Sequence, residues 1–407
     1  MILALDLGST SFKAGVFDRR LRLLEERSAP LRYRYGPGGR VELDVAWVEA
    51  AMRRVLVPRD SISVIALTSQ AQTFTVVDPH GRCRRPFVSW QDGSAGAAVA
   101  RLRRRLPDFA SHSSFADLLP CLQICQIKHR PVLQQEMVLS LPSFWVRRWT
   151  GEDVTDDNIA AMSGLYSLVH GSWWPAALRA CGLRESQLPR VVPIGSVAGV
   201  TTGHESGLPA GIPVILAGND QTAGAYGAQL HKNGATLVTL GTAQVVYRCL
   251  ERRPAARPGL IRGPYPGGRY YSMAADAWGG NLVNWAETVL VGCATHAQFF
   301  AQAARAPAGC RGLTFDPERG AWEGLNLQHE ASDMARSILE SLADRLSGLL
   351  RRVGSRPQRP LLVSGGGAGQ PVWRGIVAER LQQRVRTTRA NSLLGAARLA
   401  ADFLGIS

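Results

Sequence analysis

The sequence is short of lysine, of cysteine clusters and of long apolar runs, and each shortage excludes a class of protein. No run approaches the roughly 18 consecutive apolar residues that cross a membrane, so no membrane partner is expected. The seven cysteines are odd in number and dispersed, and no Cys or His cluster has zinc-ligand spacing. Because no apolar leader with a basic flank opens the chain, we expect a reduced, cytoplasmic protein.

Lysine supplies only three of the 47 basic side chains, although the formal net charge is +15. A nucleic-acid partner would require basic residues clustered on one surface. Arginine at almost every basic position indicates a compositional bias instead, and runs such as RLRRRL (101–106) fall on amphipathic helical patterns whose charged face is solvated. We therefore expect no nucleic-acid partner.

Alternating strand-like and helix-like patterns predict an α/β protein, and the length of 407 residues allows two domains. The opening design, a strand followed by a Gly-hydroxyl turn and a second strand, recurs at ATLVTLGTAQVVYR (235–248). Aligning the two copies places Gly8 opposite Gly241 and Asp6 opposite Thr239, as in a distant internal duplication. The pattern predicts domains at residues 1–228 and 229–407.

Two turns rich in glycine and hydroxyl residues follow strand patterns, at LGSTS (7–11) and LGTA (240–243). Such turns expose backbone N–H groups that bind phosphate oxygens, although either turn alone is more often a plain turn. Asp6 is a lone carboxylate in an apolar strand, and Mg²⁺ prefers carboxylate oxygen ligands. Together the two turns predict a clasp for one phosphate chain, with Mg²⁺ on Asp6.

Asp220 ends the apolar strand PVILAGND (213–220) and precedes a helix of small residues. A fixed carboxylate suits a general base that accepts a proton from a sugar hydroxyl while the γ-phosphate is held in line. Considered alone, Asp220 is more typical of a helix N-cap. A third segment, LLVSGGGAGQPVW (361–373), would let a flat ring such as adenine approach its glycines, although a sharp turn explains it equally well.

In this order, the segments resemble the FGGY carbohydrate kinases of the actin, Hsp70 and hexokinase superfamily. VSWQDGSA (88–95) resembles the segment near the sugar, and GAWEGLNLQHEASDMARSILE (320–340) matches a family pattern throughout. The resemblance implies an α/β fold of two actin-like (ribonuclease H-like) domains with mixed sheets that flank a nucleotide and sugar cleft. It also implies an enzyme that phosphorylates a sugar or polyol with ATP and Mg²⁺.

The resemblance assigns roles residue by residue. Asp220 is implied as the general base, and Asp6 as the ligand of Mg²⁺. The residues expected in ATP binding are Ser9, Thr10, Ser11, Lys13, Gly241, Thr242, Gly280, Asn284, Gly366, Gly367 and Gln370. The residues expected in sugar binding are Gln72, Trp90, Asp92, Asp220 and Gln221.

Two segments depart from the family pattern. Ala71 and Gln72 stand where glycerol kinases have Arg-Glu and xylulokinases Met-His, and an amide suits the hydroxyls of a neutral ketose, such as a pentulose, or a polyol. Leu122 and Cys125 occupy the family's Lys-x-x-Trp positions. A catalytically weak nucleotide- or sugar-binding sensor of the same fold is therefore the second hypothesis, and a homodimer is compatible with the sequence.

Overall fold

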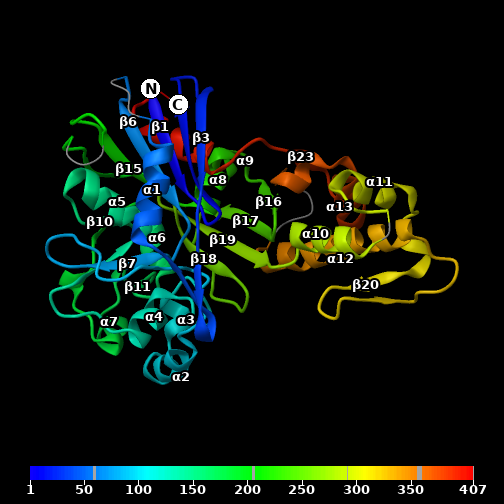
Figure 1. The fold of residues 1–407 in the computed structure, drawn as a ribbon, viewed down its shortest axis with the longest axis horizontal. Helices are drawn as coiled ribbons and strands as arrows, with labels where there is room; N and C mark the ends of the chain where they lie inside the picture. The colour runs from blue at the N-terminus through cyan, green and yellow to red at the C-terminus, as the bar shows by residue number, and fades with distance from the viewer. Residues whose placement is uncertain (58–60, 204–206, 291, 355–359, 407) are drawn as a thin grey trace. The chain divides into compact units, whose positions relative to one another are not determined.

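The computed structural model describes residues 1–57, 61–203, 207–290, 292–354 and 360–406. They form two compact units (Figure 1). The larger unit comprises Met1–Gln229, Leu250–Tyr271 and Ala390–Ser407, and the smaller unit comprises Leu230–Cys249 and Ser272–Arg389. The first break lies one residue from the expected boundary, but segments 250–271 and 390–407, which the sequence assigned to the second domain, belong to the larger unit.

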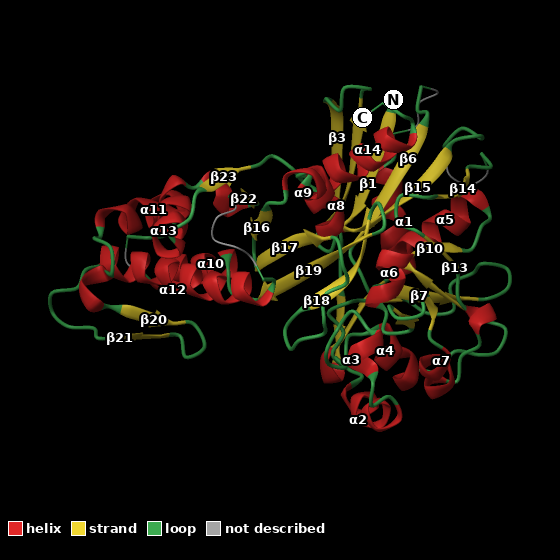
Figure 2. Cartoon of the chain, turned by 180° about the vertical axis from the view of Figure 1, so that it is seen from behind, coloured by secondary structure: helices red, strands yellow, loops and turns green. Residues whose placement is uncertain are grey.

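The larger unit is built on a mixed sheet with the strand order β14-β15-β6-β1-β2-β3 (Figure 2). Its central strand, β1, runs antiparallel to β2 and parallel to β6. The strands are β1 (Ile2–Leu7), β2 (Ser11–Phe17), β3 (Leu23–Pro30), β6 (Val64–Ser69), β14 (Val197–Val200) and β15 (Pro213–Asn219).

The two faces of β1 have different environments because side chains alternate along a strand. Leu3, Leu5 and Leu7 belong to the apolar core that includes Met52 of helix α1 (Val45–Val55). Asp6 lies on the other face, on which helix α14 (Ser392–Phe403) packs (Figure 1, red beside blue). The alternation therefore directs one carboxylate away from the apolar core and toward α14.

The rest of the larger unit surrounds a second sheet with the order β4-β5-β8-β7-β9. Its strands are β4 (Arg34–Gly36), β5 (Arg40–Leu43), β7 (Phe74–Val77), β8 (Phe87–Val88) and β9 (Met137–Ser140). Short strand pairs are formed by β10 (Val154–Asp156) with β13 (Arg190–Val192), and β11 (Tyr166–Ser167) with β12 (Ser172–Trp173). The other helices include α2 (Gly96–Arg105), α3 (Phe109–His112), α4 (Gln123–His129), α5 (Leu141–Thr150), α6 (Asp157–Met162), α7 (Pro175–Cys181) and α8 (Asp220–Gly227).

The smaller unit repeats the central topology of the larger one. Strand β16 (Thr236–Leu240) runs antiparallel to β17 (Gln244–Leu250) and parallel to β22 (Leu361–Ser364), as β1 does with β2 and β6. This agreement is what the expected internal duplication requires. Strand β23 (Val385–Thr387) pairs with β22, and β19 (Arg269–Asp276) lies next to β17. The strand before β19, β18 (Ile261–Tyr265), belongs to segment 250–271 of the larger unit. The helices are α9 (Leu230–Asn233), α10 (Gly280–Val289), α11 (His296–Arg305), α12 (Ala331–Arg352) and α13 (Pro371–Leu381).

One short hairpin forms in a segment of turn-rich composition. The segment GLTFDPERGAWEGLNL (312–327) contains the paired strands β20 (Thr314–Asp316) and β21 (Ala321–Glu323). Phe315 and Trp322 lie directly opposite one another, with ring centroids 4.8 Å apart. Cross-strand aromatic pairs stabilise such hairpins, and here the pair outweighs the turn-rich composition.

Candidate active site

Asp6 lies in the larger unit beneath α14 and is 7% exposed. Its Oδ2 accepts a hydrogen bond from the hydroxyl of Ser392 at 2.5 Å, whereas its buried Oδ1 has no hydrogen-bond partner among the described residues. The sequence did not identify Ser392. Because Asn391 is the N-cap of α14, the hydroxyl of the next residue, Ser392, is not needed for capping and bonds to Asp6 instead. An orphaned buried carboxylate oxygen fits a site that holds a cation.

Asp220 is the first residue of α8, not its cap. The N-cap is Asn219, whose side chain accepts a hydrogen bond from the backbone N–H of Thr222 at 2.9 Å. Oδ1 of Asp220 accepts from the backbone N–H of Gln221 at 2.8 Å. The capping explanation for Asp220 therefore does not apply, and its carboxylate is available for another role.

Both carboxylates have raised pKa values. Burial, and secondarily the negative charge of Asp6, raises the pKa of Asp220 to about 7. Burial also raises the pKa of Asp6, opposed by the Ser392 hydrogen bond and by the charge of Lys13. A carboxyl group with a pKa near neutrality is suited to proton transfer.

The turn at residues 7–11, which is expected to bind phosphate, joins β1 to β2. Lys13 pairs with Asp6 in the strand register, and its side chain is exposed. Ser9 and Ser11 are partly exposed and Thr10 is exposed. The carbonyl oxygen of Ser9 accepts a hydrogen bond from the Tyr33 hydroxyl at 2.6 Å. The hydroxyl residues thus lie at the accessible turn after Asp6, and Lys13 follows in β2. Their role in ATP binding stays a prediction.

Gln72 is held in an unusual backbone conformation. Its φ of 69° lies in the left-handed region, which L side chains rarely adopt. The Gln123 amide donates to its backbone carbonyl at 3.3 Å. The Gln72 side chain is 8% exposed, and its Oε1 has no hydrogen-bond partner among the described residues. Backbone strain and unsatisfied buried polar groups are common at ligand sites, and the role of Gln72 in sugar binding stays a prediction.

The other expected sugar contacts differ in accessibility. Trp90 is 41% exposed, and its backbone N–H donates to the hydroxyl of Thr73, the neighbour of Gln72, at 3.2 Å. Gln221 is partly exposed beside Asp220. Asp92, in contrast, is completely buried. The structure therefore brings Trp90 close to Gln72 but leaves Asp92 beneath the surface.

The smaller unit contains a cavity of about 370 Å³. Its lining includes every residue of this unit that the sequence assigned to ATP: Gly241, Thr242, Gly280, Asn284, Gly366, Gly367 and Gln370. Sequence reasoning missed the apolar and aromatic part of the wall: Leu240, Val283, His296, Phe300 and Trp373. Phe300 and Trp373 stack with centroids 6.1 Å apart. The cavity thus combines glycines with aromatic surface, as pockets for small molecules commonly do, and ATP binding there stays a prediction.

Close backbone contacts build this cavity. The N–H of Gly280, at the start of α10, donates to the carbonyl of Gly241 at 2.8 Å. Gly365 has a φ of +86°, and a Cβ there would lie 2.7 Å from the carbonyl oxygen of Leu240. A side chain at position 365 would therefore push the glycine segment 361–373 away from the turn at residues 240–243.

Among the described residues, no three His, Cys, Asp or Glu side chains form a metal cluster. No helix in the described part of the chain has the length and apolarity needed to span a membrane.

Comparison with known proteins decides the family. The model of the N-terminal domain of the FGGY family of carbohydrate kinases matches residues 1–227, and the model of its C-terminal domain matches residues 236–402. The chain belongs to the FGGY family of carbohydrate kinases. As an FGGY carbohydrate kinase it is a phosphotransferase of sugars or polyols with the α/β, actin-like fold expected from the sequence.

Individual FGGY kinases are similar over nearly the whole chain. The xylulose kinase of Escherichia coli K12 is 25% identical over 98% of this chain and 89% of its own length. The L-fuculokinase of Salmonella typhi is 25% identical over 94% of this chain and 87% of its own length. The crystal structure of xylulose kinase from Rhodospirillum rubrum has a TM-score of 0.88 at 26% identity, covering 99% of this chain and 90% of that one.

Proposed function

We propose that this FGGY kinase transfers the γ-phosphoryl group of ATP to a hydroxyl of a neutral ketose, such as a pentulose, or a polyol. The sugar or polyol binds the larger unit, and the nucleotide binds the cavity of the smaller unit. The observation that carries the proposal is the state of Asp220, a carboxylate at the start of α8 whose pKa is raised to about 7. Such a group accepts the proton of the attacking hydroxyl.

In the proposed reaction, Asp220 orients the hydroxyl and receives its proton. Asp6, held by Ser392 through Oδ2, keeps Oδ1 for Mg²⁺. When bound, Mg²⁺ neutralises the charge that develops on the phosphate oxygens. Thr10, Lys13 and Thr242 donate to the phosphates, while Gln72 and Trp90 contact the sugar.

The substrate class is tested by kcat/KM for ATP-dependent phosphorylation of D-xylulose, other ketoses, polyols, aldoses and gluconate. We expect a neutral ketose or polyol to rank first and gluconate to be rejected, because the Gln72 amide both donates to and accepts from hydroxyls but carries no positive charge for a carboxylate. A first rank for gluconate would contradict this assignment. ATP binding without phosphorylation of any sugar would instead favour the sensor hypothesis.

The acid limb of the pH profile reports the proposed base. Asp220 acts only when ionised, and its pKa is raised to about 7, so kcat/KM should rise with pH through about 7 and level off above it. The measurement is kcat/KM for the best sugar of the panel from pH 5.5 to pH 8.5. A profile that is flat across this range would show that the rate does not depend on ionisation of Asp220.

A further inference from the structure

The loop between β8 and α2 carries Trp90, which the proposed function places on the sugar. Three backbone hydrogen bonds fix this loop: Ser89 N–H donates to the carbonyl of Val41, Gly93 N–H donates to that of Gly39, and Trp90 N–H donates to the Thr73 hydroxyl. The exposed indole thus projects from a backbone that is held on both sides. The position of that indole depends on how firmly the loop is held.

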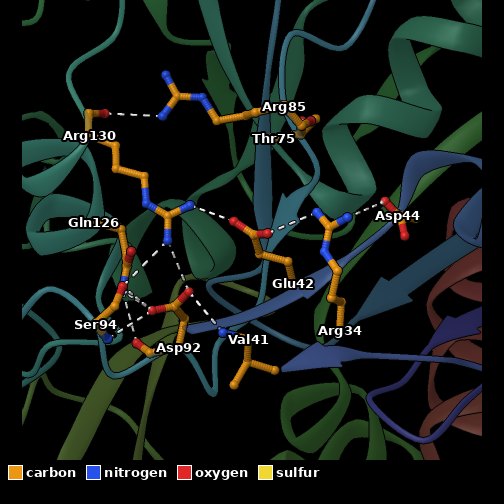
Figure 3. A network of polar contacts seen from close by, with 10 residues as sticks. All are labelled: Arg34, Val41, Glu42, Asp44, Thr75, Arg85, Asp92, Ser94, Gln126 and Arg130. Carbon is orange, nitrogen blue, oxygen red and sulfur yellow. Dashed lines mark hydrogen bonds and ion pairs between the residues drawn. The ribbon is translucent and has the colours of Figure 1, made fainter. Parts of the chain in front are cut away.

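Asp92, two residues after the tryptophan, is the centre of this attachment (Figure 3). Its Oδ2 accepts from the backbone N–H of Val41 at 3.1 Å. Its Oδ1 accepts from Ser94, through the backbone N–H at 2.9 Å and the hydroxyl at 2.5 Å, and from the Gln126 amide at 3.0 Å. Both oxygens are therefore bonded to protein donors, and the residue is 0% exposed.

Arg130 closes the network from the end of α4 (Figure 3). Its guanidinium donates to Oε1 of Glu42 at 2.6 Å and reaches Oδ2 of Asp92 at 3.4 Å. Arg34 donates to the other oxygen of Glu42 at 3.1 Å. Arg34 also pairs with Asp44 at 3.5 Å, so three carboxylates and two guanidinium groups alternate in a row (Figure 3). A buried charge is tolerated when it has an opposite partner, and a buried carboxylate such as Asp92 that loses its cationic partner is strongly destabilised.

We infer that Asp92 and Arg130 are positioning residues that act on the sugar through Trp90, and that neither contacts it. This rests on the proposed function, in which Trp90 touches the sugar. The carboxylate of Asp92 has its lone pairs engaged by Val41, Ser94 and Gln126, so a sugar hydroxyl would have to displace a bond within the protein. Direct sugar binding by Asp92, which the sequence suggested, is the competing hypothesis.

The first test observes Trp90 without any sugar. In protein labelled with 5-fluorotryptophan, the Trp90 resonance is assigned by its loss in Trp90→Phe. We expect Asp92→Asn and Arg130→Met to shift or broaden this ¹⁹F resonance in variants that remain folded by circular dichroism. Arg34→Met is the matched control, since it removes the other partner of Glu42 and leaves Asp92 untouched, and it should leave the resonance unchanged. An unmoved resonance in both network variants would overturn the inference.

The second test is a double-mutant cycle on the KM for D-xylulose. Trp90→Ala and Asp92→Asn should each raise this KM by about tenfold, within the range of coupling between neighbouring residues. In the Trp90→Ala background, Asp92→Asn should add almost nothing, because its effect passes through the missing indole. Multiplicative effects would show direct contact of Asp92 with the sugar and overturn the inference. A wild-type enzyme that phosphorylates no sugar would overturn the proposed function alone, since the fluorine test does not depend on it.

Discussion

Asp220→Asn should lower turnover by about 10²–10⁴-fold, the usual effect of removing a positioned general base. ATP binding, measured by calorimetry, should stay near the wild-type value, because the cavity proposed for the nucleotide belongs to the smaller unit. The matched control is Asp157→Asn. Burial also raises the pKa of Asp157, to about 6, but its carboxylate accepts from the backbone N–H of Ile194 and has no proposed role in catalysis.

Stability separates this catalytic role from a structural one. The folded-state pKa of Asp220 is raised, so the folded protein holds the proton more tightly than the unfolded chain, and ionisation costs stability as pH rises from about 4 to about 7. Asp220→Asn removes that cost, and its melting temperature should exceed that of the wild type at pH 8. A variant that melts lower at pH 8 and keeps its turnover would assign Asp220 to the fold.

Gly395→Ala should produce the largest loss of stability. A Cβ at residue 395 of α14 would lie 1.7 Å from the carbonyl oxygen of Ala223 in α8, so the two helix backbones would have to separate. Overpacking usually costs about 1–3 kcal/mol, and a clash with a backbone atom belongs at or above the upper end of that range. Urea unfolding measures the change in the free energy of unfolding.

The control for this prediction is Gly375→Ala in α13. A Cβ built at residue 375 meets no atom within 4 Å beyond its chain neighbours and the backbone of its own helix, so the change should stabilise the protein by about 0.5–1 kcal/mol through helix propensity. Equal urea midpoints for Gly395→Ala and the wild type would show that α8 and α14 are not in backbone contact.

The features that the sequence predicted are those that depend on neighbouring residues in the chain. The two turns, the strand before Asp220 and the third glycine segment all carry short-range signals, and they contain five of the expected cavity residues: Gly241, Thr242, Gly366, Gly367 and Gln370. Gly280 and Asn284 were expected from the family resemblance alone. Small residues in α8 and α14 allow close packing, but they do not indicate that these two helices pack against each other. The two helices are far apart in the chain, and no local sequence pattern indicates which distant helix each one will contact.

The residues that the sequence missed have unremarkable local contexts. Ser392 at a helix start is typical of a cap, and only the fold shows that Asn391 takes that role while the serine reaches Asp6. Phe300 is an ordinary apolar position of an amphipathic helix. Asp92 was recognised from its motif, but the number of protein donors around it could not be read from sequence, because Val41 and Gln126 come from distant elements.

The three-segment construction of the larger unit sets an order of events during translation. Asp6 is synthesised 386 residues before Ser392, and at about 5–20 residues per second this interval lasts roughly 20–80 s. Throughout that time, the face of β1 that α14 will cover has no partner from the C-terminal segment, while the whole smaller unit is being made. The nascent chain therefore carries this face of β1 without α14, and Asp6 without its Ser392 hydrogen bond, until α14 leaves the ribosome.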